Sequence, residues 1–235
     1  MYIFLQLIFL LYGFTLASPA LAVESCPPFE TAVITISPLL EEPQYDFSQG
    51  MHNLLAMGSA QDRHRFSSTE KETPVGLTAA AIKFKTNYQI IKTVLPSNYS
   101  VCAQIKNLRI DFGFDDTVVY VARELPRNSC SFREVFNHEL KHVNKDRQLV
   151  LLYAPEVESQ FRELINRIGI VHTTTSYAAE LEIKKEVNDY INKLSSKLAA
   201  IRQEHQQEVD SREEYARLQK ACNGDLESYV RQYRR

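Results

Sequence analysis

Residues 131–142, Ser-Phe-Arg-Glu-Val-Phe-Asn-His-Glu-Leu-Lys-His, are the most informative segment of the chain. Ser131 and Glu134 have the spacing of a capping box, in which two side chains bond the free backbone N–H groups at the start of a helix. The segment therefore predicts a helix from Ser131 to about Tyr153. Within this helix His138 and His142 are four residues apart, so they lie on one face.

The five residues from His138 to His142 have the pattern HExxH. Two imidazoles one turn apart converge on a single ion, and zinc accepts two such nitrogens while keeping a position for water. The neighbouring carboxylate of Glu139 can take a proton from this water and give it to a leaving amine. We therefore expect His138 and His142 to bind zinc and Glu139 to be the catalytic base in hydrolysis by a metal-activated water. The simpler alternative is a solvated helix face with two incidental histidines.

The N-terminal segment is typical of a secretory signal peptide. Residues 1–16 are almost wholly apolar and uncharged, and Ala20-Leu21-Ala22 is a small-x-small cleavage site. The apolar run is shorter than the ~20 residues that a spanning helix needs, so cleavage is favoured over an uncleaved membrane anchor. We expect residues 1–22 to be removed, and the mature chain to be periplasmic or secreted with no membrane partner.

The charge of the chain is balanced, with 27 Lys and Arg against 29 Asp and Glu. This balance gives no electrostatic reason to expect a nucleic-acid partner. The length of residues 23–235 fits one domain, with a β-rich part over 23–125 and a helical part over 126–235.

An even number of cysteines in an exported chain predicts disulfides rather than a cysteine metal site, because no two of them form a CxxC pair. Four cysteines allow three pairings. A bond from Cys130, for example to Cys102, would tie the start of the HExxH helix to the sheet. The four candidates are Cys26, Cys102, Cys130 and Cys222.

The segment before residue 125 has strand patterns separated by turn residues. Their close spacing predicts an antiparallel meander. We expect strands over 32–36 (ended by Pro38), 81–94, 99–114 and 117–122, with a short helix in 47–57 and a loop over 61–74.

The segment after residue 126 has helical patterns. Ala154-Pro155-Glu156 predicts the start of a second helix that Gly169 ends, and Ser176 to Glu208 has a single apolar stripe. Asp210 and Glu213 form another capping box, before a short helix that stops at Asn223-Gly224. The expected fold is α+β: an antiparallel sheet, an active-site helix and a C-terminal long-helix hairpin.

The HExxH helix, with the strand 117–124 directly before it, resembles the zincin metallopeptidases. In that group the strand before the active helix is a sheet edge that pairs with extended substrate. The resemblance implies a zincin-like fold, a peptide or protein substrate, and substrate pairing along 117–124.

The layout of the chain is also similar to the bacterial family of predicted secreted zinc-dependent proteases. That layout has a signal peptide, a β-rich front half with a cysteine, HExxH and a long helix, followed by Tyr-Asp-x-x-Thr-x-His-Gly. The corresponding stretch here is 209–215, in which only Asp210 matches. Glu213 and Tyr215 stand where the family has Thr and His.

A catalytic zinc usually has a third protein ligand. Asp146 lies on the same helix face but about 6 Å further along the axis, so we expect it behind the ligands, or paired with a neighbouring cation. Asp210 or Glu213 is the favoured third ligand, although both could act only as helix caps. Glu163 is the alternative, and Tyr215 is a candidate ligand or oxyanion donor.

Two other functions stay open for this pattern. One is hydrolysis of cell-wall peptide cross-links by the same metal site. The other is a catalytically inactive, zincin-like binding or scaffold protein of the cell envelope, with the long helix as its contact surface.

Overall fold

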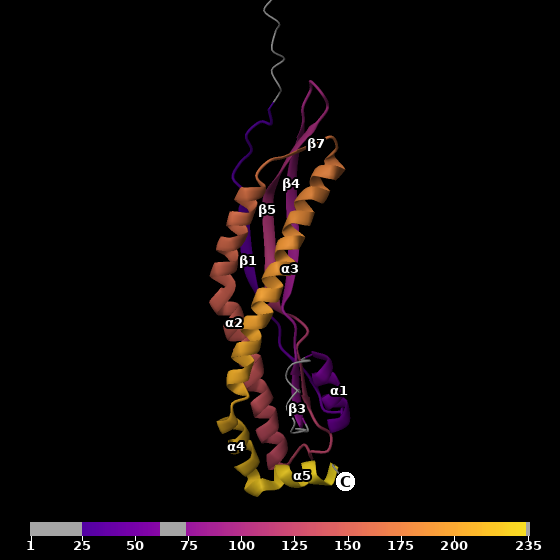
Figure 1. Ribbon diagram of the computed structural model, residues 1–235, viewed down its shortest axis with the longest axis vertical. Coiled ribbons are helices and arrows are strands. Elements are labelled where there is room, and N and C mark those ends of the chain that lie inside the picture. The colour runs from indigo at the N-terminus through magenta and orange to yellow at the C-terminus, as the bar shows by residue number, and fades with distance from the viewer. Residues whose placement is uncertain (1–24, 62–73, 234–235) are drawn as a thin grey trace, which may run out of the picture.

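The computed structural model describes residues 25–61 and 74–233. These residues form an elongated α+β molecule in which two sheets follow one another along the long axis (Figure 1). The expected signal peptide, residues 1–22, and most of the expected loop over 61–74 lie outside the described residues.

Sheet A, the longer sheet, is built around β5, whose 14 residues are mostly buried. Its partners are β4, which is antiparallel, β1, which is parallel, and β7, which is antiparallel and pairs with the other end of β5. The expected strands over 81–94 and 99–114 are confirmed as β4 and β5. The bounds are β1 Val33–Leu40, β4 Lys83–Val94, β5 Val101–Phe114 and β7 Val171–Thr173.

Sheet B has the strand order β2-β6-β3, with β6 in the centre. β2 is parallel to β6 and β3 is antiparallel to it. The bounds are β2 Gln44–Asp46, β3 Gly76–Ala79 and β6 Val118–Val121.

The expected antiparallel meander is wrong, because both sheets are mixed. The chain leaves sheet A after β1, forms β2, α1 and β3, and only then returns to sheet A as β4. This long excursion allows β1 and β5 to run in parallel, which a tight hairpin cannot do. β1 also continues through Pro38, which is tolerated because β5 is its one partner among the described strands.

The resemblance placed the substrate-pairing edge on the strand just before the active helix, and this expectation is wrong. That strand is β6, and it has a partner on both sides. The edge beside the active helix is β3, which contacts α2. Its four residues Gly-Leu-Thr-Ala gave no strand signal, because the run is short and two of its residues have low β propensity.

α2 is one continuous helix rather than the two that Pro155 predicted. An internal proline costs ~3 kcal/mol because it removes a hydrogen bond and crowds the preceding turn. Here the apolar stripe continues in phase past it, with Val150, Val157 and Phe161 buried in one core. Gly169 ends the helix as expected, with a positive φ of 58°.

The helices are α1 Met51–Gln61, α2 Cys130–Ile168, α3 Ser176–Val209, α4 Arg212–Lys220 and α5 Asp225–Tyr233, with a 3-10 turn over Ala221–Gly224. The expected long helix is confirmed as α3 to within one residue. No described helix has both the length and the apolar content that crossing a membrane requires.

Both predicted capping boxes are displaced from the true cap, by two residues at α2 and by one residue at α4. The N-cap of α2 is Ser129, whose Oγ accepts the Phe132 N–H at 3.0 Å, and Ser131 is buried inside the helix. The N-cap of α4 is Ser211, whose Oγ accepts the Glu214 N–H at 3.3 Å. Asp210 is therefore not needed as the cap of α4.

The main core lies between sheet A and the antiparallel helices α2 and α3, which are apart at the upper end and cross near the middle of the molecule (Figure 1). Phe112 of β5 and Phe161 of α2 are among its largest buried side chains, and Ile183 and Leu198 contribute from the stripe of α3. A smaller cluster, which includes Leu218, packs α4 and α5 against the first turns of α2.

Two disulfides are present, as the cysteine count predicted. Cys26 bonds Cys102, and Cys130 bonds Cys222. The suggested bond between Cys130 and Cys102 is wrong: Cys102 lies where β5 pairs with β7, while Cys130 opens α2 beside the C-terminal helices. The second bond therefore ties the start of the HExxH helix to the C-terminal segment.

Candidate metal centre

The HExxH residues face the interior, which rules out the alternative of a solvated helix face. His138, Glu139 and His142 are 5%, 4% and 6% exposed. The Nε2 atoms of the two histidines are 3.3 Å apart. Buried imidazoles at this separation share one small volume of space on one side of α2.

Asp210 joins the two histidines from the end of α3. Its Oδ1 lies 3.2 Å from Nε2 of His138 and 3.2 Å from Nε2 of His142. Asp210 is the C-cap residue of α3, in a non-helical conformation that turns the chain toward α4. The three residues form a group that could hold a metal ion.

The other two ligand candidates are not brought to this group. Glu213 is exposed in the first turn of α4. Glu163 is exposed on α2, 21 residues after His142, which is about 32 Å along a continuous helix at 1.5 Å per residue. Glu163 could approach His142 only if the chain turned back near Pro155. α2 instead continues past this proline, so Glu163 lies far from the histidines.

A second group of possible ligands within the described residues, Cys26, Cys102 and His172, has a different character. Both sulfurs are bonded to each other, so they are not thiolate ligands. His172 instead contacts Ser100, with 2.6 Å between Nε2 and Oγ.

The outer nitrogens of both site histidines have acceptor partners from the C-terminal helices. His138 Nδ1 lies 3.3 Å from Glu214 Oε1, and His142 Nδ1 contacts Gln206 Oε1. An ionised carboxylate only accepts, so the His138 proton is placed on Nδ1. Its Nε2 lone pair then points toward Asp210.

Electrostatics favour the protonation states that metal binding needs. Burial lowers the pKa of His138 below its usual value, against the opposite effect of Glu214, so the imidazole is neutral near pH 7. Arg217, with help from Lys141 and His138, lowers the pKa of Glu214 to about 2. Glu214 therefore stays an acceptor for the His138 N–H.

The geometry of the three atoms fits zinc. At Zn–N distances of 2.0–2.1 Å and Zn–O distances of 2.0–2.2 Å, two ligand atoms of a tetrahedral site are about 3.3–3.5 Å apart. The three observed separations are 3.2, 3.2 and 3.3 Å. Two imidazole lone pairs and a carboxylate oxygen this close repel one another unless a cation or a proton lies between them.

Glu139 faces β3. Thr78 Oγ1 lies 2.8 Å from Glu139 Oε2 and 3.1 Å from its backbone oxygen. A Cβ atom at Gly76 would be only 2.4 Å from Glu139 Oε1, so only glycine leaves room for this carboxylate. Sequence reasoning missed Thr78 and Gly76, because their role depends on packing between elements about 60 residues apart.

Tyr215 lies beside the group, as the sequence suggested. Its hydroxyl donates a hydrogen bond to Asp210 Oδ1 at 3.2 Å, and its ring centroid is 6.1 Å from that of His138. The hydroxyl is thus held at the same oxygen that approaches both histidines. Tyr215 is positioned to orient Asp210 or to meet a group that enters the site.

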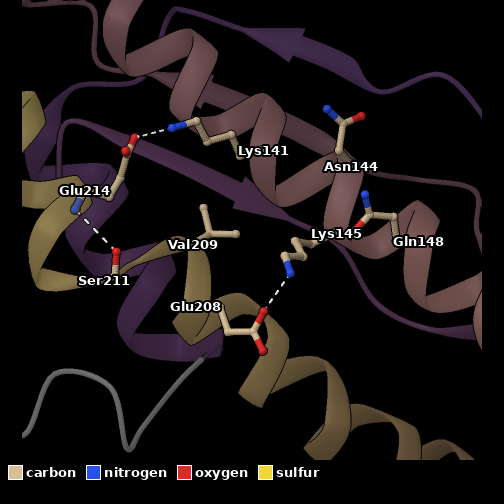
Figure 2. Close-up of a pocket in the computed structure, with 8 residues that line it drawn as sticks. All are labelled: Lys141, Asn144, Lys145, Gln148, Glu208, Val209, Ser211 and Glu214. Atoms are coloured by element: carbon tan, nitrogen blue, oxygen red, sulfur yellow. Dashed lines mark hydrogen bonds and ion pairs between the residues drawn. The ribbon is translucent and has the colours of Figure 1, made fainter.

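A pocket of about 450 Å³, lined mostly by charged and amide-bearing residues, lies next to the group, between α2 and the junction of α3 with α4 (Figure 2). Lys141 and Lys145 reach across it to Glu214 and Glu208, each with 2.6 Å between nitrogen and oxygen. Residues two apart differ by about 200° around a helix, so the Lys141 side of α2 faces away from Glu139. The pocket is therefore separate from the side of α2 on which Glu139 lies.

Three comparisons with known proteins gave no match: no family model, no curated protein and no solved structure is similar to this chain.

Proposed function

We propose that the chain is an exported, zincin-type metallopeptidase that hydrolyses peptide bonds. The observation that carries this proposal is the triangle of His138 Nε2, His142 Nε2 and Asp210 Oδ1, with sides of 3.2–3.3 Å. A buried carboxylate, Glu139, lies on the same turn of α2. Two histidines, an acidic third ligand and a neighbouring base are the donor set of a hydrolytic zinc site.

The residues of the site have separate roles in the proposed hydrolysis. His138, His142 and Asp210 hold the metal, which when bound would supply a Lewis acid that acidifies a water and polarises the scissile carbonyl. Glu139 accepts the proton of the attacking water and passes it to the leaving amine. Thr78 keeps the Glu139 carboxylate oriented through the 2.8 Å hydrogen bond.

The substrate would bind as an extended peptide along β3. Among the described strands β3 pairs with β6 alone, so its other edge has no strand partner among them. The side chain of Thr78 on this strand contacts the base. Addition of a peptide strand to β3 would therefore bring a backbone carbonyl close to Glu139.

Export is supported by two features. The two disulfides are typical of an oxidising compartment. Residues 1–22 have the layout of a cleavable signal peptide. We propose a periplasmic or secreted location and a peptide or protein substrate, which includes the peptides of a cell wall.

The scaffold alternative has less support from the packing of α3. Its apolar stripe is used inside the molecule, where Ile183, Val187 and Leu198 are buried against the rest of the main core. This stripe is therefore not available as a contact surface for a partner.

The test is hydrolysis of an unfolded protein substrate by the chain from residue 23 onward, loaded with zinc. Glu139→Gln should retain the metal and lose about 10²–10⁴-fold in turnover, the range that a general base contributes. Glu163→Gln, an exposed glutamate on the same helix, is the matched control and should keep full activity. Undiminished hydrolysis by Glu139→Gln would overturn the proposal.

A further inference from the structure

We propose that Gln206 is a positioning residue for His142. It holds the proton of this histidine on Nδ1, so that Nε2 is unprotonated and can bind the metal. This inference rests on the proposed zinc site. The hydrogen bonds around Gln206 carry it, because they allow its side-chain amide one orientation only.

The amide nitrogen of Gln206 has two partners that can only accept. Nε2 lies 2.6 Å from Asp146 Oδ1 and 3.2 Å from the backbone oxygen of His142. The NH₂ group must therefore face these two oxygens, and Oε1 must face His142. Since Oε1 is an acceptor, the nitrogen it meets, Nδ1 of His142, must carry a hydrogen.

Asp146 cannot relax this requirement, because Arg202 holds both of its oxygens as acceptors in one geometry. The guanidinium donates to both oxygens of Asp146, from Nε at 2.7 Å and from Nη2 at 2.8 Å. Asp146 is 2% exposed, so water does not compete for these bonds. A buried carboxylate with a bidentate arginine partner is held strongly in one geometry. The sequence placed Asp146 behind the ligands, and it lies there, two hydrogen bonds from His142.

The network gives the end of α3 a double role. Gln206 and Asp210 are four residues apart, so one turn of helix supplies both the fixed partner of His142 Nδ1 and the oxygen that faces His142 Nε2. Without Gln206 the two nitrogens of a neutral imidazole could each carry the proton, and the ring could turn. Loss of such an outer partner typically weakens metal binding 10- to 100-fold.

The first measurement uses metal-free protein, so it does not depend on zinc. Side-chain ¹H–¹⁵N correlation spectra at pH 8 should show His142 protonated on Nδ1 in the wild type. In Gln206→Met, which nearly conserves volume but offers no amide, the ¹⁵N shifts of His142 should move toward the Nε2-protonated or mixed form. Gln207→Met, the exposed neighbour on the same helix, is the control and should leave these shifts unchanged.

A second variant covers the case in which Gln206→Met does not fold. Gln206→Ala also removes the amide and adds no side chain that this buried position must accommodate. The ¹⁵N shifts of His142 should then move toward the Nε2-protonated or mixed form, as in Gln206→Met. In the folded variants zinc should bind about 10- to 100-fold more weakly than in the wild type.

Two results would overturn the inference, and they differ. If the wild type binds zinc but neither variant changes the His142 shifts or the zinc dissociation constant, Gln206 has no positioning role and the proposed function stands. If the wild type shows the predicted proton position but binds no zinc, the proposed function fails and the role of Gln206 in metal binding fails with it.

Discussion

Asp210 is the residue on which the proposed centre depends most. Its Oδ1 is equidistant from the two histidine nitrogens, at 3.2 Å, and it also accepts the hydroxyl of Tyr215. Ser211 caps α4, so the side chain of Asp210 is available for another role. Two histidines alone would give zinc one ligand fewer than catalytic sites usually have.

Replacement of Asp210 should therefore weaken zinc binding more than the loss of any outer partner. We expect Asp210→Ala to raise the zinc dissociation constant by more than about 100-fold, the upper range for outer-partner variants. Glu213→Ala, three residues on and exposed, should leave the constant unchanged. Competition titrations with a chelator measure both, and equal effects in the two variants would remove Asp210 as the ligand.

The residues of the site differ in how far the sequence could predict them. His138, Glu139 and His142 follow from helical spacing, which is a local property. Asp210 could be suggested because it lies at the end of the long helix, which can fold back over the site, and because the family resemblance has an aspartate there. Gln206 and Thr78 had no signal, since each meets the site through contacts over more than 60 residues of chain.

Among the elements, β3 has the clearest consequence for activity. It is a four-residue edge strand whose Thr78 hydroxyl lies 2.8 Å from the carboxylate of the base. Hydrogen bonds to charged groups contribute about 1.5–3 kcal/mol. In the proposed mechanism the strand therefore orients Glu139 and also offers an edge to substrate.

Removal of the Thr78 hydroxyl should lower turnover without removing zinc. We expect Thr78→Val to reduce kcat by about 10- to 100-fold, which corresponds to the loss of one hydrogen bond to a charged group. Thr78→Ser keeps the hydroxyl and should recover most of the rate. Steady-state kinetics with metal analysis test this, and a Thr78→Val enzyme as active as Thr78→Ser would show that the hydrogen bond has no role in catalysis.

The element predictions failed where packing outweighs local preference. Pro155 predicted a break in α2, but burial of Val157 and Phe161 keeps the helix continuous. β3 escaped detection because its pairing with β6, rather than its own composition, makes it a strand. The long helix was predictable, since its stripe of buried residues repeats over nine turns.

At the scale of the whole molecule, the site depends on the way the C-terminal helices are attached. The end of α3 and the start of α4 contact α2 near its first turns, through Gln206, Asp210 and Glu214. The disulfide between Cys130 and Cys222 joins these two segments covalently. The bond between Cys26 and Cys102 lies elsewhere, on β5.

The two disulfides should therefore differ in their effect on metal binding. Replacement of Cys130 and Cys222 by serine should lower stability by about 2–5 kcal/mol and also weaken zinc binding. The Cys26 and Cys102 double-serine variant should lose stability in the same range but bind zinc with unchanged affinity. Chemical denaturation and zinc titration of the folded variants measure the two effects. Equal zinc affinity in the two variants would mean that the C-terminal segment holds its place without the bond.

The type and order of the elements were predictable in outline, but the pairing of the strands and of the cysteines was not. Alternating apolar residues in 81–94 and the apolar stripe of 176–209 fix the type of each element. The parallel pairs of β1 with β5 and β2 with β6 depend on contacts between distant parts of the chain. The cysteine count predicted two disulfides. Which cysteines pair depends on the fold, which places Cys102 beside β7 and Cys130 at the start of α2, far from each other.

The proposed zinc centre is tested most directly by the zinc content of the purified chain from residue 23 onward, measured after metal removal, reconstitution and dialysis. We predict about one zinc per chain in the wild type, as expected for a single site with three protein ligands. His138→Ala should retain almost none, while His52→Ala, which changes an exposed histidine on α1, should retain the full amount. A wild type without zinc, or a His138→Ala variant that holds as much as the wild type, would contradict the account.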